Sequence, residues 1–261
     1  MKPASPPRSI LITGASSGLG AALARHYAAA AAHLVLVGRN RERLASVADD
    51  CRRAGGTADA RPADVADAGA MAALVAAADA ATPLDLVIAN AGVSAGTLGG
   101  PESSEQVRRL FAINIDGVVN TVQPSIDAMR RRGRGQIALV SSLAAWRGFP
   151  GAPVYCASKA AIKTWGEALR GSLHAEGIAV SVICPGYVET AMTEKNDFWM
   201  PMMMPAEKAA RIIARGLARN RPRIAFPWPL YAAVVLIGLL PPALIDPLMR
   251  RLPAKAGSLS G

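Results

Sequence analysis

The sequence predicts an α/β fold in which helices cover both faces of a doubly wound, mostly parallel sheet of seven strands. Short aliphatic runs alternate with longer, Ala-rich stretches, which is the pattern of repeated β-α-β units. The runs LVLVG at 34–38 and IAVSVIC at 178–184 are apolar at nearly every position, as expected of parallel strands buried on both faces. A glycine-rich turn follows the first run, where such folds bind ligands.

Seven segments carry the strand pattern, and the Ala-rich segments between them favour helices. The predicted strands are Ser9 to Thr13, Leu34 to Gly38, Thr57 to Pro62, Leu84 to Ala89, Gln136 to Ser141, Ile178 to Cys184 and Arg223 to Phe226. Right-handed crossovers place ligands at the carboxyl ends of such strands. The residues that follow each strand are therefore the first candidates for a functional site.

The length and composition fit one sizeable domain. The chain has 261 residues, of which 51% are hydrophobic and 18% charged, so its apolar side chains suffice for a full core. We expect a flexible N-terminus at residues 1–8, a main domain at 9–226 and an apolar C-terminal extension at 227–261.

Cysteine usage and the start of the chain predict a cytoplasmic protein without a bound metal. Cys51, Cys156 and Cys184 are too few and too dispersed for a disulfide framework or a zinc site. The first residues lack the continuous apolar stretch of a secretory signal.

The formal charge of +10 is compatible with binding to nucleic acid, to anionic lipid or to a phosphorylated small molecule. The densest basic run, Arg130 to Arg134, lies between a predicted helix and a predicted strand, which favours a solvated loop. Aromatic residues are not interleaved with basic ones, so we do not expect a nucleic-acid partner.

The turn Thr13 to Gly20, TGASSGLG, precedes an Ala-rich helix, so its backbone N–H groups and the helix dipole can hold a pyrophosphate. The spacing of Gly14, Gly18 and Gly20 differs from the common GxGxxG fingerprint, and an ordinary flexible turn is the alternative. The pattern TGxxxGxG resembles the cofactor loop of the short-chain dehydrogenase/reductase family. That resemblance implies a Rossmann-like fold that binds a nicotinamide dinucleotide.

Further motifs resemble those of the same family and follow in the same order. Asp64-Val65 resembles its adenine-contacting pair, and Asn90-Ala91-Gly92 resembles its sheet-supporting motif, with Ala89 where the family often has another asparagine. Pro185-Gly186 ends the sixth strand, and Thr190 matches the threonine that contacts the nicotinamide carboxamide. The cofactor-binding residues that the resemblance implies are Gly14, Ser16, Ser17, Gly18, Leu19, Gly20, Arg39, Asp64, Val65, Asn90, Ala91, Gly92, Tyr155, Lys159, Pro185, Gly186, Val188 and Thr190.

The end of the second strand predicts NADP(H) rather than NAD(H). An acidic residue there would accept hydrogen bonds from a ribose 2′-hydroxyl, but the chain has Gly38-Arg39. A guanidinium binds a 2′-phosphate through charge-assisted hydrogen bonds. The alternative is that Arg39, with Arg41 and Arg43, only decorates the start of a helix.

Tyr155 and Lys159 are candidates for proton transfer because they stand four residues apart on one face of a predicted helix. A nearby ammonium favours the phenolate and moves the tyrosine pKa toward neutral pH. A lone Tyr-x-x-x-Lys is common, since a core tyrosine often lies beside a solvated lysine.

The family resemblance implies a catalytic tetrad built around this pair. Ser142 would hydrogen-bond the carbonyl oxygen, Tyr155 would donate the proton, Lys159 would bind the nicotinamide ribose, and Asn114 would position a water in the proton relay. Ser141 should point to the opposite side of the strand from Ser142.

The Met-rich segment at 189–207 occupies the place of the family's substrate lid. Its methionines adapt to irregular apolar ligands, while Pro201 and Pro205 interrupt regular structure. The alternative for such a stripe is ordinary core packing. A bulky or lipid-like ketone would suit a lid of this composition.

The segment Ile224 to Ile245 is the most apolar in the chain but is interrupted by prolines, and its longest unbroken stretch is too short for a bilayer core of about 30 Å. Two interpretations stay open. The segment could lie in a membrane interface at the inner face, with Trp228 and Tyr231 at headgroup depth and basic residues facing anionic lipid, namely Arg250, Arg251 and Lys255. It could instead form a subunit interface or a wall of the substrate pocket.

Together these features predict an NADPH-dependent oxidoreductase that interconverts a carbonyl and an alcohol by hydride transfer on a small hydrophobic or lipid-like substrate. The lid and apolar tail are similar to those of lipid-active members such as 3-ketosphinganine reductases. The resemblance also implies a homo-oligomer, a dimer or a tetramer. The rival hypothesis is a sensor or scaffold protein that binds NADP(H) without turnover.

Overall fold

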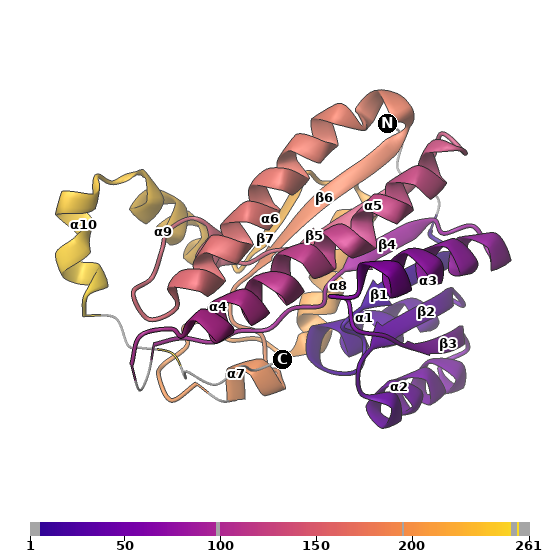
Figure 1. Cartoon of the computed structure of the whole chain (residues 1–261), viewed down its shortest axis with the longest axis horizontal. Coiled ribbons are helices and arrows are strands. Elements are labelled where there is room, and N and C mark those ends of the chain that lie inside the picture. The colour runs from indigo at the N-terminus through magenta and orange to yellow at the C-terminus, as the bar shows by residue number, and fades with distance from the viewer. Residues whose placement is uncertain (1–5, 98–99, 195, 252–254, 256–261) are drawn as a thin grey trace.

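One sheet of seven parallel strands organises the chain, with helices on both of its faces (Figure 1). The computed structural model describes residues 6–97, 100–194, 196–251 and 255. The strand order is β3-β2-β1-β4-β5-β6-β7. The strands are β1 Ser9–Thr13, β2 His33–Gly38, β3 Thr57–Pro62, β4 Leu86–Ala89, β5 Gly135–Val140, β6 Ile178–Pro185 and β7 Arg223–Phe226. The predicted fold class is confirmed.

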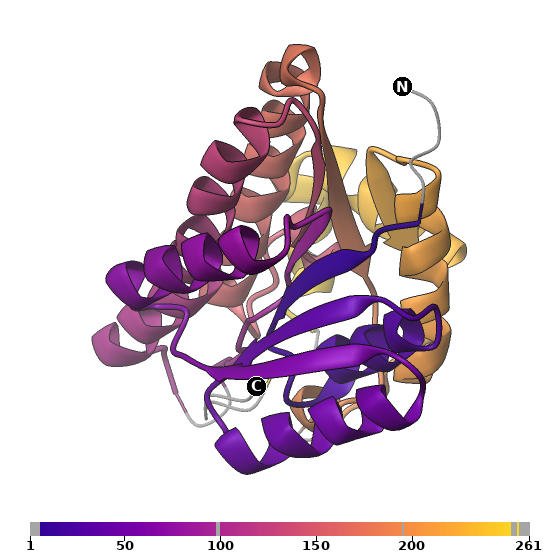
Figure 2. The same cartoon turned by 90° about the vertical axis from the view of Figure 1, so that its right-hand side faces the viewer.

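Two layers of helices enclose the sheet (Figure 2). One face is covered by α1 Gly18–Ala28, α2 Arg41–Arg53 and α8 Ala206–Ala218. The other is covered by α3 Ala68–Ala81, α4 Ser104–Phe111, α5 Gly117–Arg130 and α6 Pro153–Ser172. Because the strand order reverses between β1 and β4, the loops that follow these strands diverge and leave a crevice at their carboxyl ends.

The unbroken apolar runs of the sequence reflect this double coverage. Ile10 and Ile12 of β1 pack beneath α1, while Leu11 between them packs on the opposite face, and none of the three is exposed. Neighbouring side chains of a strand point to opposite faces, so a strand covered on both sides needs an apolar residue at every position.

Some strand ends differ from the predicted ones. β4 begins at Leu86 rather than Leu84, because the Leu84 N–H donates to the carboxylate of Asp79 at 3.0 Å instead of entering the sheet. β5 ends at Val140, so Ser141 and Ser142 both lie just beyond it. These shifts move no predicted site residue away from the strand ends.

The basic run at 130–134 is largely exposed, as its composition suggested, except at Arg132. Arg132 forms an ion pair with Asp79 at 2.7 Å and donates to the Leu84 carbonyl at 3.0 Å, and the side chains of Arg132 and Asp79 are only 20% and 10% exposed. Arg130 pairs with Glu176. The prediction is therefore wrong for Arg132 alone, and both arginines tie the α5–β5 connection to neighbouring segments.

The C-terminal extension forms two helices, α9 Trp228–Leu239 and α10 Pro242–Met249, which lie at one end of the molecule (Figure 1). Val234 on α9 packs into a buried cluster with Leu143 and Cys184, while Leu239 on the same helix is 78% exposed. Among the described helices, none combines the length and apolarity that a bilayer crossing requires.

Tyr231, which one interpretation places at headgroup depth, contacts the main domain. Its ring packs edge-on against Trp146 with the centroids 5.3 Å apart, and its hydroxyl accepts a hydrogen bond from Arg223 at 3.0 Å. These contacts fasten α9 to the main domain.

Candidate active site

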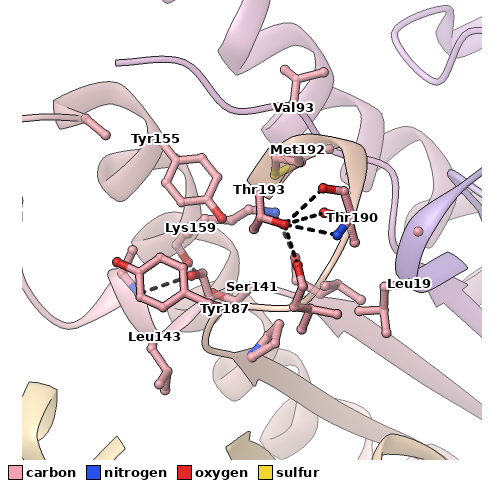
Figure 3. A pocket seen from close by; sticks show the side chains of 18 of the residues that line it. Leu19, Val93, Ser141, Leu143, Tyr155, Lys159, Tyr187, Thr190, Met192 and Thr193 are labelled. Atoms are coloured by element: carbon pink, nitrogen blue, oxygen red, sulfur yellow. Dashed lines mark hydrogen bonds between the residues drawn. The ribbon is translucent and has the colours of Figure 1, made fainter. Parts of the chain in front are cut away.

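The carboxyl ends of the strands open into a cavity of about 1000 Å³ (Figure 3). It is lined by most of the residues that the sequence singled out: Gly14, Ser16, Ser17, Gly18, Leu19, Arg39, Asp64, Val65, Asn90, Ala91, Gly92, Ser142, Tyr155, Lys159, Pro185, Gly186, Val188 and Thr190. Gly20 and Asn114 are not among the lining residues. Gly20 packs against Gly14, and Asn114 binds the backbone of Val93, so both contact residues that line the cavity.

The glycine-rich turn is shaped by close backbone approach. Gly14 has a φ of +64°, and a Cβ there would lie 2.8 Å from the Ala91 Cα. A Cβ on Gly20 would overlap the Gly14 carbonyl, so Gly20 supports the turn from below. At Gly18, with φ +51°, a Cβ would lie 2.8 Å from the Thr190 Cγ2. The turn therefore needs glycine at each position, and the ordinary flexible turn does not describe it.

Asn90 holds the turn against the neighbouring strand. Its Nδ2 donates to the carbonyl oxygens of Thr13 at 3.0 Å and Gly14 at 3.2 Å. The Thr13 hydroxyl in return accepts hydrogen bonds from the N–H groups of Asn90 and Ala91, each at 3.1 Å. One asparagine thus joins the ends of β1 and β4 without a polar residue at Ala89.

Two arginines line the end of the cavity beside β2. Arg39 and Arg43 both border it, whereas Arg41, which lies between them in sequence, does not. Asn40 caps α2 by accepting a hydrogen bond from the Arg43 N–H at 2.8 Å. The sequence motifs give Arg43 no role in the site. The capping asparagine, which fixes where the helix starts, is the sequence signal that indicates it.

The predicted adenine-contacting pair lies across the same end of the cavity. The Asp64 carboxylate accepts a hydrogen bond from the Ala66 N–H at 3.1 Å and lies 3.5 Å from the Arg109 guanidinium. These contacts orient the carboxylate, which together with Val65 lines the cavity.

Tyr155 and Lys159 of α6 reach the cavity from the same side (Figure 3). The Lys159 Nζ lies 5.8 Å from the centroid of the Tyr155 ring. Burial raises the pKa of Tyr155 to about 12, and a hydrogen bond with Ser142 acts in the opposite direction. The expectation that Lys159 brings this pKa toward neutral is not met in the protein by itself, because burial dominates. Tyr155 is therefore a protonated phenol at neutral pH.

Lys159 is anchored at the end of β5. Its Nζ donates to the Val140 carbonyl at 3.1 Å. Burial lowers its pKa to about 8; the nearby Cys184 raises the pKa, and Lys255 lowers it further. Ser141 also lines the cavity, so the expectation that it faces away from Ser142 is not met. Its hydroxyl donates to the Lys159 backbone carbonyl at 2.7 Å and fastens α6 to the strand end.

Ser142 is oriented by the turn that follows β5. Its hydroxyl accepts a hydrogen bond from the Ala144 N–H at 3.1 Å, at the start of a short 3-10 turn, Leu143–Ala145. The Ser142 and Tyr155 hydroxyls lie within hydrogen-bonding distance of each other, so both can donate a hydrogen bond to the same oxygen atom of a ligand.

Asn114 lies in a π-helical turn, Ala112–Asp116, between α4 and α5. Its amide oxygen accepts from the Val93 N–H at 2.8 Å, and its Nδ2 donates to the Val93 carbonyl at 2.9 Å and to Ser158 at 3.1 Å. A Cβ on Gly92 would lie 3.2 Å from both the Asn114 Oδ1 and the Lys159 Nζ. Asn114 thus lies beside Lys159 but uses its amide to hold the backbone.

The other end of the cavity is apolar. The Met-rich segment lines it with Met192, Phe198, Trp199 and Pro201. Within that segment Thr193 donates to the Val188 carbonyl at 2.7 Å and accepts from the Thr190 N–H at 3.0 Å, which shapes the turn around α7, Ala191–Glu194 (Figure 3). The two C-terminal helices contribute Leu230, Ala233, Val234, Ile237, Leu248 and Met249. The interpretation of the extension as a pocket wall is therefore supported.

Lys255 also lines the cavity, which the sequence analysis missed. The prediction that it faces anionic lipid is wrong, because its Nζ lies 5.0 Å from the Tyr155 ring centroid. No motif marks Lys255, so the sequence alone does not reveal its place in the cavity.

Comparison with known proteins agrees with this geometry. A family model described as short chain dehydrogenase matches residues 8–201. The chain is 37% identical over 246 residues to an uncharacterized oxidoreductase of Myxococcus xanthus, a match covering 94% of this chain and 97% of that protein. A solved short-chain dehydrogenase from Sphingobium yanoikuyae in complex with NADPH shares the fold with a TM-score of 0.79 at 24% identity, covering 94% and 96% of the two chains. A variant of actinorhodin polyketide ketoreductase with NADPH has a TM-score of 0.76 at 26% identity, covering 85% and 96%.

Proposed function

The chain belongs to the short-chain dehydrogenase/reductase family of oxidoreductases, and on that basis we propose that it reduces the carbonyl group of bulky apolar substrates with NADPH. The observation that carries the proposal is one cavity with a dinucleotide cradle at one end, a buried phenol in the middle and an apolar chamber at the other end.

The cradle fits NADP(H). The turn at 13–20 presents backbone N–H groups at the start of α1, and a side chain at Gly14 or Gly18 would collide with Ala91 or Thr190 and distort the turn. Arg39 and Arg43 provide positive charge beside the end of β2, where a 2′-phosphate would be bound. The polyketide ketoreductase with a related fold contains NADPH, which supports the assignment. When bound, the reduced nicotinamide supplies the hydride.

Tyr155 supplies the proton. A phenol whose pKa is raised to about 12 keeps its proton at neutral pH and can donate a hydrogen bond to a carbonyl oxygen. Ser142 beside it offers a second donor to the same oxygen, which polarises the carbonyl. Lys159 presents an ammonium for a ribose hydroxyl, and Asn114 fixes the backbone of Val93 next to it.

The apolar chamber selects the substrate. Side chains from the proposed lid at 189–207 and from α9 and α10 line the same cavity as Tyr155 and Ser142, although they come from segments far apart in sequence. A small ketone would leave this surface wet, whereas a bulky one would bury it, at roughly 25 cal/mol for each Å² removed from water. We therefore expect kcat/KM to rise with the apolar size of the ketone.

The proposal is tested by nicotinamide absorbance with a graded series: acetone, cyclohexanone, an aryl alkyl ketone and a long-chain methyl ketone. We expect NADPH oxidation that strengthens along the series and exceeds that with NADH. No turnover of any member, or equal turnover of acetone and the long-chain ketone, would contradict it.

A further inference from the structure

The C-terminal segment brings a second lysine to the reacting groups. The Lys255 N–H donates to the Gly151 carbonyl at 3.2 Å, and the same carbonyl accepts from the Thr97 N–H at 3.1 Å. A Cβ placed on Gly96 would lie 2.5 Å from the Lys255 Cβ. The loop after β4 and the loop before α6 therefore leave space for the stem of this lysine, and a larger residue at Gly96 would displace it.

The Lys255 ammonium faces the cavity, and no described carboxylate pairs with it. Its Nζ lies 5.0 Å from the Tyr155 ring centroid, on a ring that Lys159 also approaches. Among the described residues, no carboxylate forms an ion pair with Lys255. Burial lowers its pKa to about 8, as expected of a cation removed from water without an anion beside it. Such burial costs free energy that an anionic ligand would offset.

We propose that Lys255 binds a carboxylate of the substrate, so that the enzyme selects oxo acids whose carboxylate lies within a few bonds of the carbonyl group. The inference rests on the proposed function. Tyr155 holds the carbonyl oxygen and the Lys255 ammonium lies over the same ring, so a ligand that satisfies both carries its two polar groups close together. The remaining hydrocarbon chain fits the walls formed by α9 and α10.

The position of Lys255 favours the substrate over the cofactor as the source of the anion. Arg39 and Arg43 line the end of the cavity beside β2, where the cofactor phosphate is expected. Lys255 instead contacts Gly96 and Gly151, which do not belong to the glycine-rich turn. A carboxylate bound here would be positioned by a charge-assisted hydrogen bond next to the proton donor.

The first test compares γ-oxodecanoate with its methyl ester, which has the same chain but no charge. We expect the wild-type enzyme to prefer the acid. Lys255→Met should lower kcat/KM for the acid by roughly 10- to 100-fold, the range for one lost hydrogen bond to a charged group, and change the ester little. Lys255→Arg should retain the preference, and Lys208→Met, which removes an exposed charge on α8, should behave as wild type.

The second test measures binding without turnover. Calorimetry with Tyr155→Phe protein should detect γ-oxodecanoate more strongly than its ester, and the added Lys255→Met change should remove the difference. Turnover of the ester without any Lys255-dependent preference for the acid would overturn this inference and leave the proposed function intact. Lys255-dependent acid binding without turnover of any ketone would contradict the proposed function and leave the carboxylate site intact. An equal loss of acid and ester in Lys255→Met would show that the lysine only shapes the cavity and would overturn the inference.

Discussion

At the scale of single residues, the environment of each side chain decides its chemistry. Tyr155 and Lys159 lie one turn apart on α6, but burial moves their pKa values in opposite directions, to about 12 and about 8. The phenol becomes a weaker acid and the ammonium a stronger one. A protonated Tyr155 suits proton donation to a carbonyl oxygen, and the reverse reaction would require it to be deprotonated.

Cofactor preference should depend on Arg39. Arg39→Asp replaces a cation beside the expected 2′-phosphate with an anion, so we expect the ratio of kcat/KM for NADPH to that for NADH to fall at least roughly 10- to 100-fold. Arg41→Asp is the matched control, because Arg41 shares the start of α2 but does not line the cavity. Steady-state kinetics with both cofactors provide the measurement, and an unchanged ratio in Arg39→Asp would refute the assignment.

Lys159 should make stability depend on pH. Its pKa is about 8 in the folded protein and 10.5 as the reference value, so between these limits the unfolded chain binds more protons and the free energy of unfolding rises with pH. Below pH 8 both states are protonated and the full cost of burying the ammonium is present. Lys159→Met removes that cost, so its stability advantage over wild type should shrink by about 3 kcal/mol between pH 8 and 10.5.

Denaturant unfolding of both proteins at pH 7.5 and at pH 10.5, without cofactor, checks this prediction. A difference between the two proteins that stays constant across the pH range would show that Lys159 titrates normally.

At the scale of elements, sequence patterns located the sheet and the turns but not every contact between them. The motifs at 13–20, 90–92 and 155–159 come together because each directly follows a strand or lies on a helix beside one, which periodicity and turn chemistry reveal. The ion pair of Arg132 with Asp79 and the position of Lys255 join segments far apart in sequence without any local signature. They could not be predicted because tertiary packing alone creates them.

The wall formed by α9 should limit the size of the substrate. Ala233 lines the cavity, so Ala233→Trp would fill part of the chamber. We expect KM for a long-chain ketone to rise roughly tenfold or more, while acetone turnover stays within about twofold of wild type, because excess volume in a packed site costs about 1–3 kcal/mol. Ala232→Trp is the control, since Ala232 is the adjacent residue of α9 and does not line the cavity. Equal effects of the two variants on the long-chain ketone would argue against α9 as a wall.

At the scale of the whole molecule, the sequence predicted the fold class well. Short aliphatic runs alternate with Ala-rich segments along nearly the entire chain, which is the pattern of repeated β-α-β units. The division into a main domain at 9–226 and an extension stays a prediction, although Val234 and Tyr231 pack against the main domain. The predicted homo-oligomer likewise stays a prediction, and light scattering of the purified protein measures it directly.

Cofactor binding should stabilise the whole fold. A ligand that binds only the native state at a concentration of about 100 Kd adds about 2.7 kcal/mol to the free energy of unfolding. For a domain of this size that corresponds to a rise in Tm of roughly 5 °C or more. We expect NADPH to give this shift and NADH at the same concentration to give clearly less, as measured by thermal unfolding followed by circular dichroism. Equal shifts in Tm with the two nucleotides would contradict the assignment of Arg39 and Arg43 to the 2′-phosphate.

Tyr155 as the proton donor is the central assignment, and Tyr155→Phe tests it most directly. The measurement is kcat/KM for NADPH-dependent reduction of the best ketone, with Tyr27→Phe, which removes a buried hydroxyl on α1 outside the cavity, as the control. We predict a loss of at least about 100-fold in Tyr155→Phe, with the NADPH-induced rise in Tm retained and the control unchanged. Reduction by Tyr155→Phe within about tenfold of wild type, with NADPH still bound, would contradict the account.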